Sequence, residues 1–155
     1  MLFRSFFFTP AYFLFMDTLA VLVFAGLVTA AIVMRRRTAW HSRLMVCAMA
    51  VLTGPAIGRV VPAPLVMPWV GLTVFAFVIL FPLLGMIADR RRYGVHPAWL
   101  AGLATLVVMQ LAIELLPRSA AGLAFYRAVT AGWPGALVLP DAYPPPPWAR
   151  PGAGG

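Results

Sequence analysis

The sequence contains no lysine and only four acidic residues, and charged residues make up 10% of its 155 positions. Ordinary soluble domains carry about a quarter charged residues. A water-soluble domain with so few charges would have almost nothing polar with which to cover its surface. Hydrophobic residues reach 63%, and the mean hydropathy is +0.92. The composition therefore excludes an ordinary soluble globule and indicates one domain embedded in lipid.

Cysteine and catalytic motifs are also scarce. The single cysteine, Cys47, lies inside an apolar run, which excludes an intrachain disulfide and is typical of a small buried side chain. The sequence contains no Gly-x-Ser-x-Gly elbow, phosphate-binding loop, Cys-x-x-Cys or His-Glu-x-x-His pattern. These absences predict a non-enzymatic protein with no resident cofactor.

Long apolar runs are what the sequence does contain. The first run would form a helix about 36 Å long, which exceeds the roughly 30 Å hydrocarbon core of a bilayer. It could instead be a cleaved signal peptide, but its length and the heavier positive charge that follows it favour a retained span. We therefore expect an all-α, polytopic integral membrane protein whose membrane domain, residues 1–133, is a four-helix bundle. The expected spans are residues 11–34, 41–61, 69–88 and 98–116.

The net charge of +8 comes from twelve arginines, most of them in two short connections between apolar runs. Arginine-rich loops of membrane proteins stay on the cytoplasmic side, so four spans would place both termini in the periplasm of a bacterial cytoplasmic (inner) membrane. Clustered cations also bind nucleic acid in soluble proteins, but this placement predicts a lipid bilayer as the partner, and no nucleic acid. The topology-determining residues would be Arg35, Arg36, Arg37, Arg43, Arg90, Arg91 and Arg92.

The chain beyond the fourth run is less regular. Residues 119–133 mix apolar side chains with Arg127 and two glycines, which favours a short helix in the membrane interface over a fifth span. Residues 134–155 include four consecutive prolines and end in a glycine-rich stretch. We expect this Pro/Gly-rich tail to be extended or disordered, because it cannot bury a core.

Charged side chains inside spans are costly in lipid and are candidate sites for that reason. Asp17, Arg59 and Glu114 would all lie in the outer third of the membrane, where Arg59 could pair with either carboxylate and fix helix packing. Gln110, one turn from Glu114, would extend such a network. A small transporter or proton pathway could use the same groups.

The second run raises further alternatives. Ala50, Gly54 and Gly58 form a strip of small residues that would let another helix approach closely. His41 and Met45, one turn apart, are suitable ligands for a soft metal. His41 and His96 would lie at similar depth and could be axial ligands of a b-type haem, although histidines at a membrane edge also serve as helix caps or headgroup contacts.

The stretch RRRTAWHSRLMVCAMAVLTGPAIGRV resembles a segment of small, largely uncharacterised bacterial inner-membrane proteins with a His-x-Arg-Leu-Met element. In related families some members assist respiratory-oxidase assembly, so the resemblance implies a haem or oxidase-assembly role as an alternative. This sequence departs from the pattern at Ser42, which stands at the usual basic position, and it lacks histidines within its other spans. The function that we expect first is a non-enzymatic scaffold or small subunit of a membrane complex. The resemblance is carried by His41, Arg43, Leu44, Met45, Pro55 and Arg59.

Overall fold

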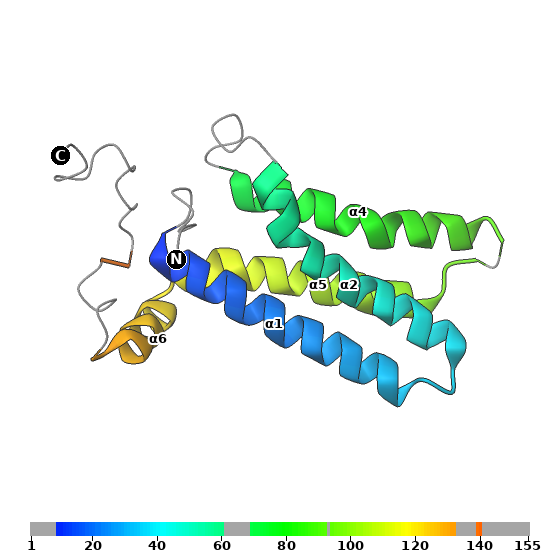
Figure 1. Cartoon of the computed structure of the whole chain (residues 1–155), viewed down its shortest axis with the longest axis horizontal. Coiled ribbons are helices and arrows are strands. Elements are labelled where there is room, and N and C mark those ends of the chain that lie inside the picture. Colours follow the sequence, from blue (N-terminus) through cyan, green and yellow to red (C-terminus); the bar gives the residue numbers. More distant parts are fainter. Residues whose placement is uncertain (1–8, 61–68, 93, 133–138, 141–155) are drawn as a thin grey trace, which may run out of the picture. The chain divides into compact units, whose positions relative to one another are not determined.

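The structure, a computed structural model, describes residues 9–60, 69–92, 94–132 and 139–140, except for the side chain of Arg59. Across these residues it contains helices and no strand, which confirms the all-α class. The elements, labelled as in Figure 1, are α1 (Pro10–Val33), α2 (Thr38–Val60), α4 (Val70–Arg90), α5 (Pro97–Leu115), the 3-10 turn η1 (Leu116–Arg118) and α6 (Ala120–Thr130).

The four longest helices begin and end within a few residues of the four apolar runs. Three segments are long and apolar enough to cross a membrane: α1, α4, and α5 together with η1. The helix α2 is not one of these three segments, and it is the least apolar of the four long helices, since it carries Arg43 and Arg59. Its 23 residues still give a length of about 34 Å, which matches the neighbouring helices.

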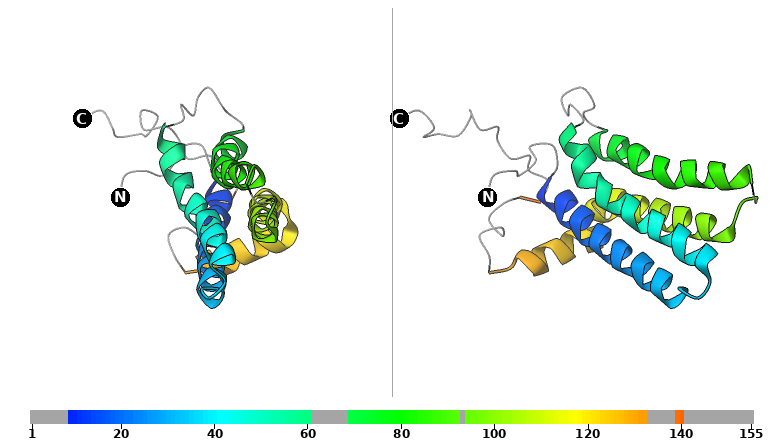
Figure 2. Two further views of the ribbon diagram at one scale, coloured as in Figure 1. Left: turned by 90° about the vertical axis from the view of Figure 1, so that its right-hand side faces the viewer. Right: turned by 45° about the vertical axis from the view of Figure 1, so that its right-hand side comes forward.

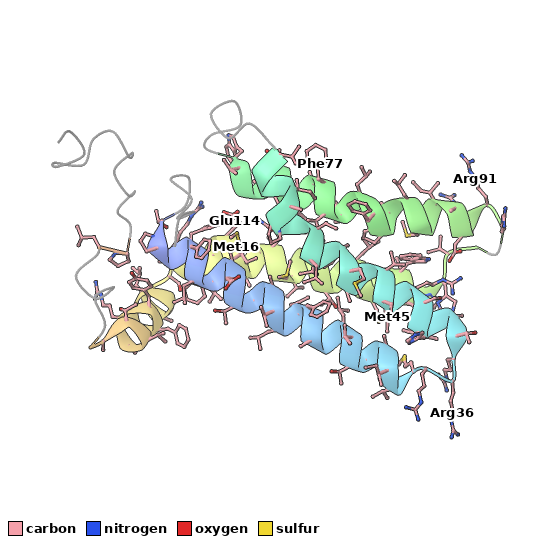
Figure 3. All side chains as sticks on the ribbon, viewed as in Figure 1. Met16, Arg36, Met45, Phe77, Arg91 and Glu114 are labelled. Carbon is pink, nitrogen blue, oxygen red and sulfur yellow. The ribbon has the colours of Figure 1, made fainter. Side chains whose placement is uncertain are left out.

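The exposed faces of the helices are apolar. A helix packed on a core in water has a polar outer face. On α4 the buried positions are Val70, Val78 and Pro82, yet the exposed side of the same helix carries leucine, isoleucine and phenylalanine, including Phe77 in Figure 3. Such a surface suits contact with lipid better than contact with water. Its exposed large apolar residues are Leu72, Phe77, Leu80, Phe81, Leu84 and Ile87.

The chain forms two compact units, and the larger one spans Thr18–Ala112. In it, α2 packs along α4, and the glycines of α2 permit the close approach that the small-residue strip predicts. A Cβ atom at Gly54 would lie 3.8 Å from a methyl group of Val78, and one at Gly58 would lie 3.8 Å from Val74. The α1–α2 turn and the α4–α5 loop lie at the same end of this unit (Figures 1 and 2).

The smaller unit contains the start of α1 and the chain from Ile113 onward. Ser119 caps α6, because its Oγ accepts a hydrogen bond of 3.0 Å from the backbone N–H of Gly122. A Cβ at Gly122 would collide with the carbonyl of Leu116, so the turn into α6 requires glycine. The segment expected in the interface is therefore the helix α6. The predicted tail, residues 134–155, lies outside the described residues apart from Leu139 and Pro140.

Candidate functional site: a polar cluster at the arginine-rich end

Three helices of the larger unit meet at Asp89, near the C-terminal end of α4. The Nε of Arg43 on α2 donates to Asp89 Oδ2 at 2.6 Å, and the indole Nε1 of Trp99 on α5 donates to the same oxygen at 2.7 Å. Arg43 also donates from Nη1 to the carbonyl of Ala39 at 2.6 Å. We call Arg43, Asp89 and Trp99 the polar cluster. It compensates the charge of Arg43, whose side chain is only 14% exposed.

Two glycines allow the helices to approach closely enough for the polar cluster to form. The ring of Trp99 covers Gly85, where a Cβ would lie 2.8 Å from Cζ2 of the indole. A Cβ at Gly102 would collide with the Sγ of Cys47 and lie 3.0 Å from its Cβ. Cys47 is fully buried there, as the sequence predicts of a small apolar side chain. Close glycine contacts therefore hold α5 against both α4 and α2.

His41 closes the C-terminal end of α1. The last carbonyl groups of a helix have no partner within it, and the backbone N–H of Arg35 bonds to Ile32, which leaves Ala31 unpaired by its own helix. The His41 Nδ1 lies 2.8 Å from that carbonyl oxygen. Because a carbonyl only accepts, the proton is on Nδ1, and a neutral ring keeps its lone pair on Nε2.

At the start of α5, His96 accepts a hydrogen bond from the backbone, whereas His41 donates one. The backbone N–H of Ala98 donates to His96 Nδ1 at 3.2 Å, so that nitrogen acts as the acceptor and a neutral ring carries its proton on Nε2. The ring of Trp40 contacts His96 edge-on, with centroids 5.4 Å apart. This contact joins the two arginine-bearing connections.

A haem ligated from both sides would require His96 to give up its hydrogen bond at the start of α5. An axial ligand must offer iron an unprotonated nitrogen. The Nε2 of His41 meets that condition, but in His96 one nitrogen accepts the cap hydrogen bond and the other is protonated. No group of three or more His, Cys, Asp or Glu side chains within the described chain could hold a metal ion either. Among the described residues, no cluster of these side chains therefore adds to His41 and Met45 as ligands of a metal ion.

The charged residues predicted for the outer third are only partly brought together. The Glu114 carboxylate accepts from Tyr12 Oη at 2.8 Å and from Arg118 Nη2 at 3.3 Å, and Gln110 is buried one turn away on α5. Asp17 is exposed, and no ion pair among the described side chains includes it. The Arg59 side chain lies outside the described residues, so its pairing remains a prediction.

The arginines of the two connections are exposed, apart from Arg43. Arg36 and Arg91, both labelled in Figure 3, extend from the same end of the larger unit. We call the exposed groups on either side of the Trp40–His96 contact the arginine triplets, and no ion pair among the described side chains involves them. The arginine triplets are Arg35, Arg36 and Arg37, and Arg90, Arg91 and Arg92.

Sequence reasoning missed Asp89 and Trp99. The available signal was that Asp89 is the only acidic residue between Asp17 and Glu114, in a stretch that holds eight arginines: Arg35, Arg36, Arg37, Arg43, Arg59, Arg90, Arg91 and Arg92. Next to three arginines it resembled a loop residue. Its position one turn after Gly85 instead places it beneath the Trp99 indole.

The fold and the polar cluster define an all-α protein with three helices that can cross a membrane and an ion pair between helices at its arginine-rich end. No protein-family model, curated protein or solved structure matches the chain.

Proposed function

We propose that the protein is a non-enzymatic integral membrane protein that serves as a scaffold or small subunit of a membrane complex. In this proposal α1, α2, α4 and α5 each cross a bacterial cytoplasmic membrane, and both termini are periplasmic. The observation that carries the proposal is the set of partners to which the polar side chains bond. The polar cluster and the two histidines bond to the chain's own helices, while the outer faces of the helices are apolar.

The crossing of α2 is supported by its packing and by its charges. It lies along α4, which is apolar enough to cross, and it is about as long. Arg43 is compensated by Asp89 near the end of the helix, where an arginine is least costly in a membrane. The exposed arginine triplets at this end support its assignment to the cytoplasm.

Labelling of introduced cysteines with a membrane-impermeant maleimide tests the topology. Thr38→Cys and Val95→Cys leave every arginine in place, and Ala131→Cys reports on the end of α6; all three positions are exposed. In a Cys47→Ala background, intact cells should label only Ala131→Cys, and broken cells should label all three. Labelling of Thr38→Cys or Val95→Cys from outside would contradict the orientation.

The subunit role is tested by the size of the native assembly. Membranes from cells that express the tagged chain at its natural level are extracted in mild detergent and separated by blue native electrophoresis. We expect the tagged chain in a species heavier than the purified 16.8 kDa protein, with reproducible cross-links to a defined partner. A chain that migrates only at the size of the purified protein would contradict this role.

A further inference from the structure

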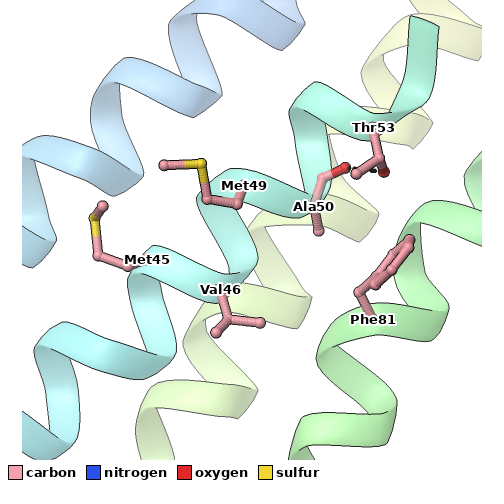
Figure 4. A pocket seen from close by; sticks show the side chains of 6 residues that line it. All are labelled: Met45, Val46, Met49, Ala50, Thr53 and Phe81. Atoms are coloured by element: carbon pink, nitrogen blue, oxygen red, sulfur yellow. Dashed lines mark hydrogen bonds between the residues drawn. The ribbon is translucent and has the colours of Figure 1, made fainter. Parts of the chain in front are cut away.

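A groove runs along the exposed side of α2 and ends at α4. It has a volume of about 270 Å³ and is lined by Met45, Val46, Met49, Ala50, Thr53 and Phe81, which Figure 4 shows from close by. This is slightly smaller than the roughly 300–1,000 Å³ of pockets that enclose small-molecule ligands. An open groove of this size can contact one side of a flexible hydrocarbon chain.

The lining of the groove is chemically apolar. Thr53 carries its only hydroxyl group, and that Oγ1 donates to the carbonyl of Ala50 at 2.7 Å. Met49 and Phe81 are each 49% exposed, so the groove opens outward. The thioether side chains of Met45 and Met49 adapt readily to the shape of an apolar partner. The part of a ligand that lies in the groove must therefore be a hydrocarbon.

Arginines lie at a similar distance from the groove along each of the two helices that form it. Arg37 directly precedes α2 and lies eight residues before Met45, about 12 Å along the direction of the helix. On α4, Arg90 follows Phe81 by nine residues, about 13 Å in the same direction. Figure 3 shows Arg36 and Arg91 at one end, where they extend in opposite directions, with Met45 farther along α2. The arginine triplets are exposed and have no ion-pair partner among the described side chains.

A molecule that fits both features has an anionic head about 12 Å from the start of its hydrocarbon contacts. Arginine binds phosphate with charge-assisted, often bidentate hydrogen bonds. Basic groups on the cytoplasmic side of a membrane favour anionic over zwitterionic lipid. We propose that this arginine-rich end and the groove bind one anionic phospholipid, with its phosphate at the triplet Arg35, Arg36 and Arg37 and one acyl chain along α2. This proposal rests on the proposed membrane location.

Binding of defined lipids to the full-length protein in detergent tests the proposal. The probes are dioleoylphosphatidylglycerol and dioleoylphosphatidylcholine, with each dissociation constant measured by native mass spectrometry. We expect phosphatidylglycerol to bind about tenfold more tightly than phosphatidylcholine. Equal binding would overturn the proposal.

Variants separate the contribution of the head from that of the chain. The triple variant Arg35→Gln, Arg36→Gln, Arg37→Gln should remove most of the preference, and the same positions changed to lysine should retain most of it. The control Arg118→Gln, Arg127→Gln, Arg150→Gln loses the same net charge elsewhere and should keep the preference. A preference that survives the first triple variant would refute the role of these arginines.

Filling the groove tests the acyl-chain contact. Met49→Trp places a bulky ring in the groove and should weaken the binding of both lipids by about fivefold. Leu52→Trp is the control, because Leu52 is 52% exposed on the same helix but does not line the groove. Unchanged lipid binding by Met49→Trp would overturn the groove as the site. Circular dichroism and size-exclusion chromatography establish that each variant is folded.

A separate measurement distinguishes the failure of this inference from the failure of the proposed function. Alkaline carbonate should leave the protein in the membrane pellet. Release into the supernatant would contradict membrane integration itself. A chain that stays in the pellet but binds both lipids equally would contradict only the lipid site.

Discussion

Asp89 shows how one side chain can compensate a largely buried charge on the least apolar of the four long helices. Arg43 on α2 is 14% exposed, and without a partner it would leave a charge largely removed from water. Asp89 supplies the opposite charge, and its second hydrogen bond, from Trp99, fixes the carboxylate in place. The polar cluster thus connects three helices through one oxygen atom.

Substitutions of Asp89 should lower the thermal stability more when they remove more of its interactions. Asp89→Asn keeps an acceptor for Trp99 but loses the charge opposite Arg43, and Asp89→Leu loses both. We therefore expect the melting temperature in detergent to fall from the unaltered protein to Asp89→Asn and again to Asp89→Leu. The fluorescence of a thiol-reactive dye follows unfolding, since Cys47 is buried in the folded chain.

A second substitution tests whether the effect belongs to the ion pair. Arg43→Gln should cost much less in the Asp89→Asn background than alone, because the interaction has already been removed. Additive losses in the double variant would show that Arg43 and Asp89 do not interact in the folded protein.

At the scale of elements, the change from glycine to alanine should have opposite effects on stability at two positions on different helices. A Cβ at Gly102 would collide with Cys47 on α2, and overpacking of this kind costs about 1–3 kcal/mol. A Cβ at Gly54 would meet Val78 at 3.8 Å, an ordinary contact distance, and alanine is favoured over glycine in a helix by about 1 kcal/mol.

We therefore expect Gly102→Ala to destabilise the protein and Gly54→Ala to leave it unchanged or stabilise it. Denaturant unfolding in mixed micelles, followed by circular dichroism, measures both variants. Cys47→Ala in the Gly102→Ala background removes the colliding sulfur and should restore part of the loss. Equal effects of the two glycine variants would argue against the close contact between α2 and α5.

The elements were largely predictable from the sequence, and their contacts were less so. Long apolar runs flanked by arginine and proline locate the helices to within a few residues. The strip with Gly54 and Gly58 indicated a close neighbour, which is α4. The polar cluster was not predicted, because it depends on which helices are adjacent. No spacing within one helix could relate Arg43 to residues 46 and 56 positions later.

At the scale of the whole molecule, the surrounding medium determines the effect of a surface substitution. Leu80 is 45% exposed near the middle of α4. In water, a change to arginine at such a position alters stability by less than about 0.5 kcal/mol. At the centre of a membrane helix, arginine costs about 2.5–3.5 kcal/mol. We expect Leu80→Arg to reduce the amount of folded protein in the membrane fraction sharply.

Leu80→Ala is the matched control, because it shortens the side chain without adding charge. It should accumulate in the membrane fraction nearly as well as the unaltered protein. Immunoblots of membrane and soluble fractions compare the two variants. A Leu80→Arg protein that accumulates normally would argue for water around α4.

The packing of α2 along α4 also has a consequence for synthesis. Alone, α2 carries two arginines and is the least apolar of the four long helices, so it partitions into lipid poorly when it first leaves the ribosome. The carboxylate that compensates Arg43 is translated more than forty residues later, at the end of α4. A released chain truncated before Val70 should therefore hold α2 accessible to aqueous reagents, and a chain that extends through Arg90 should shield it. In the proposed membrane location, α2 and α4 should therefore enter the bilayer together as a helical hairpin rather than one after the other.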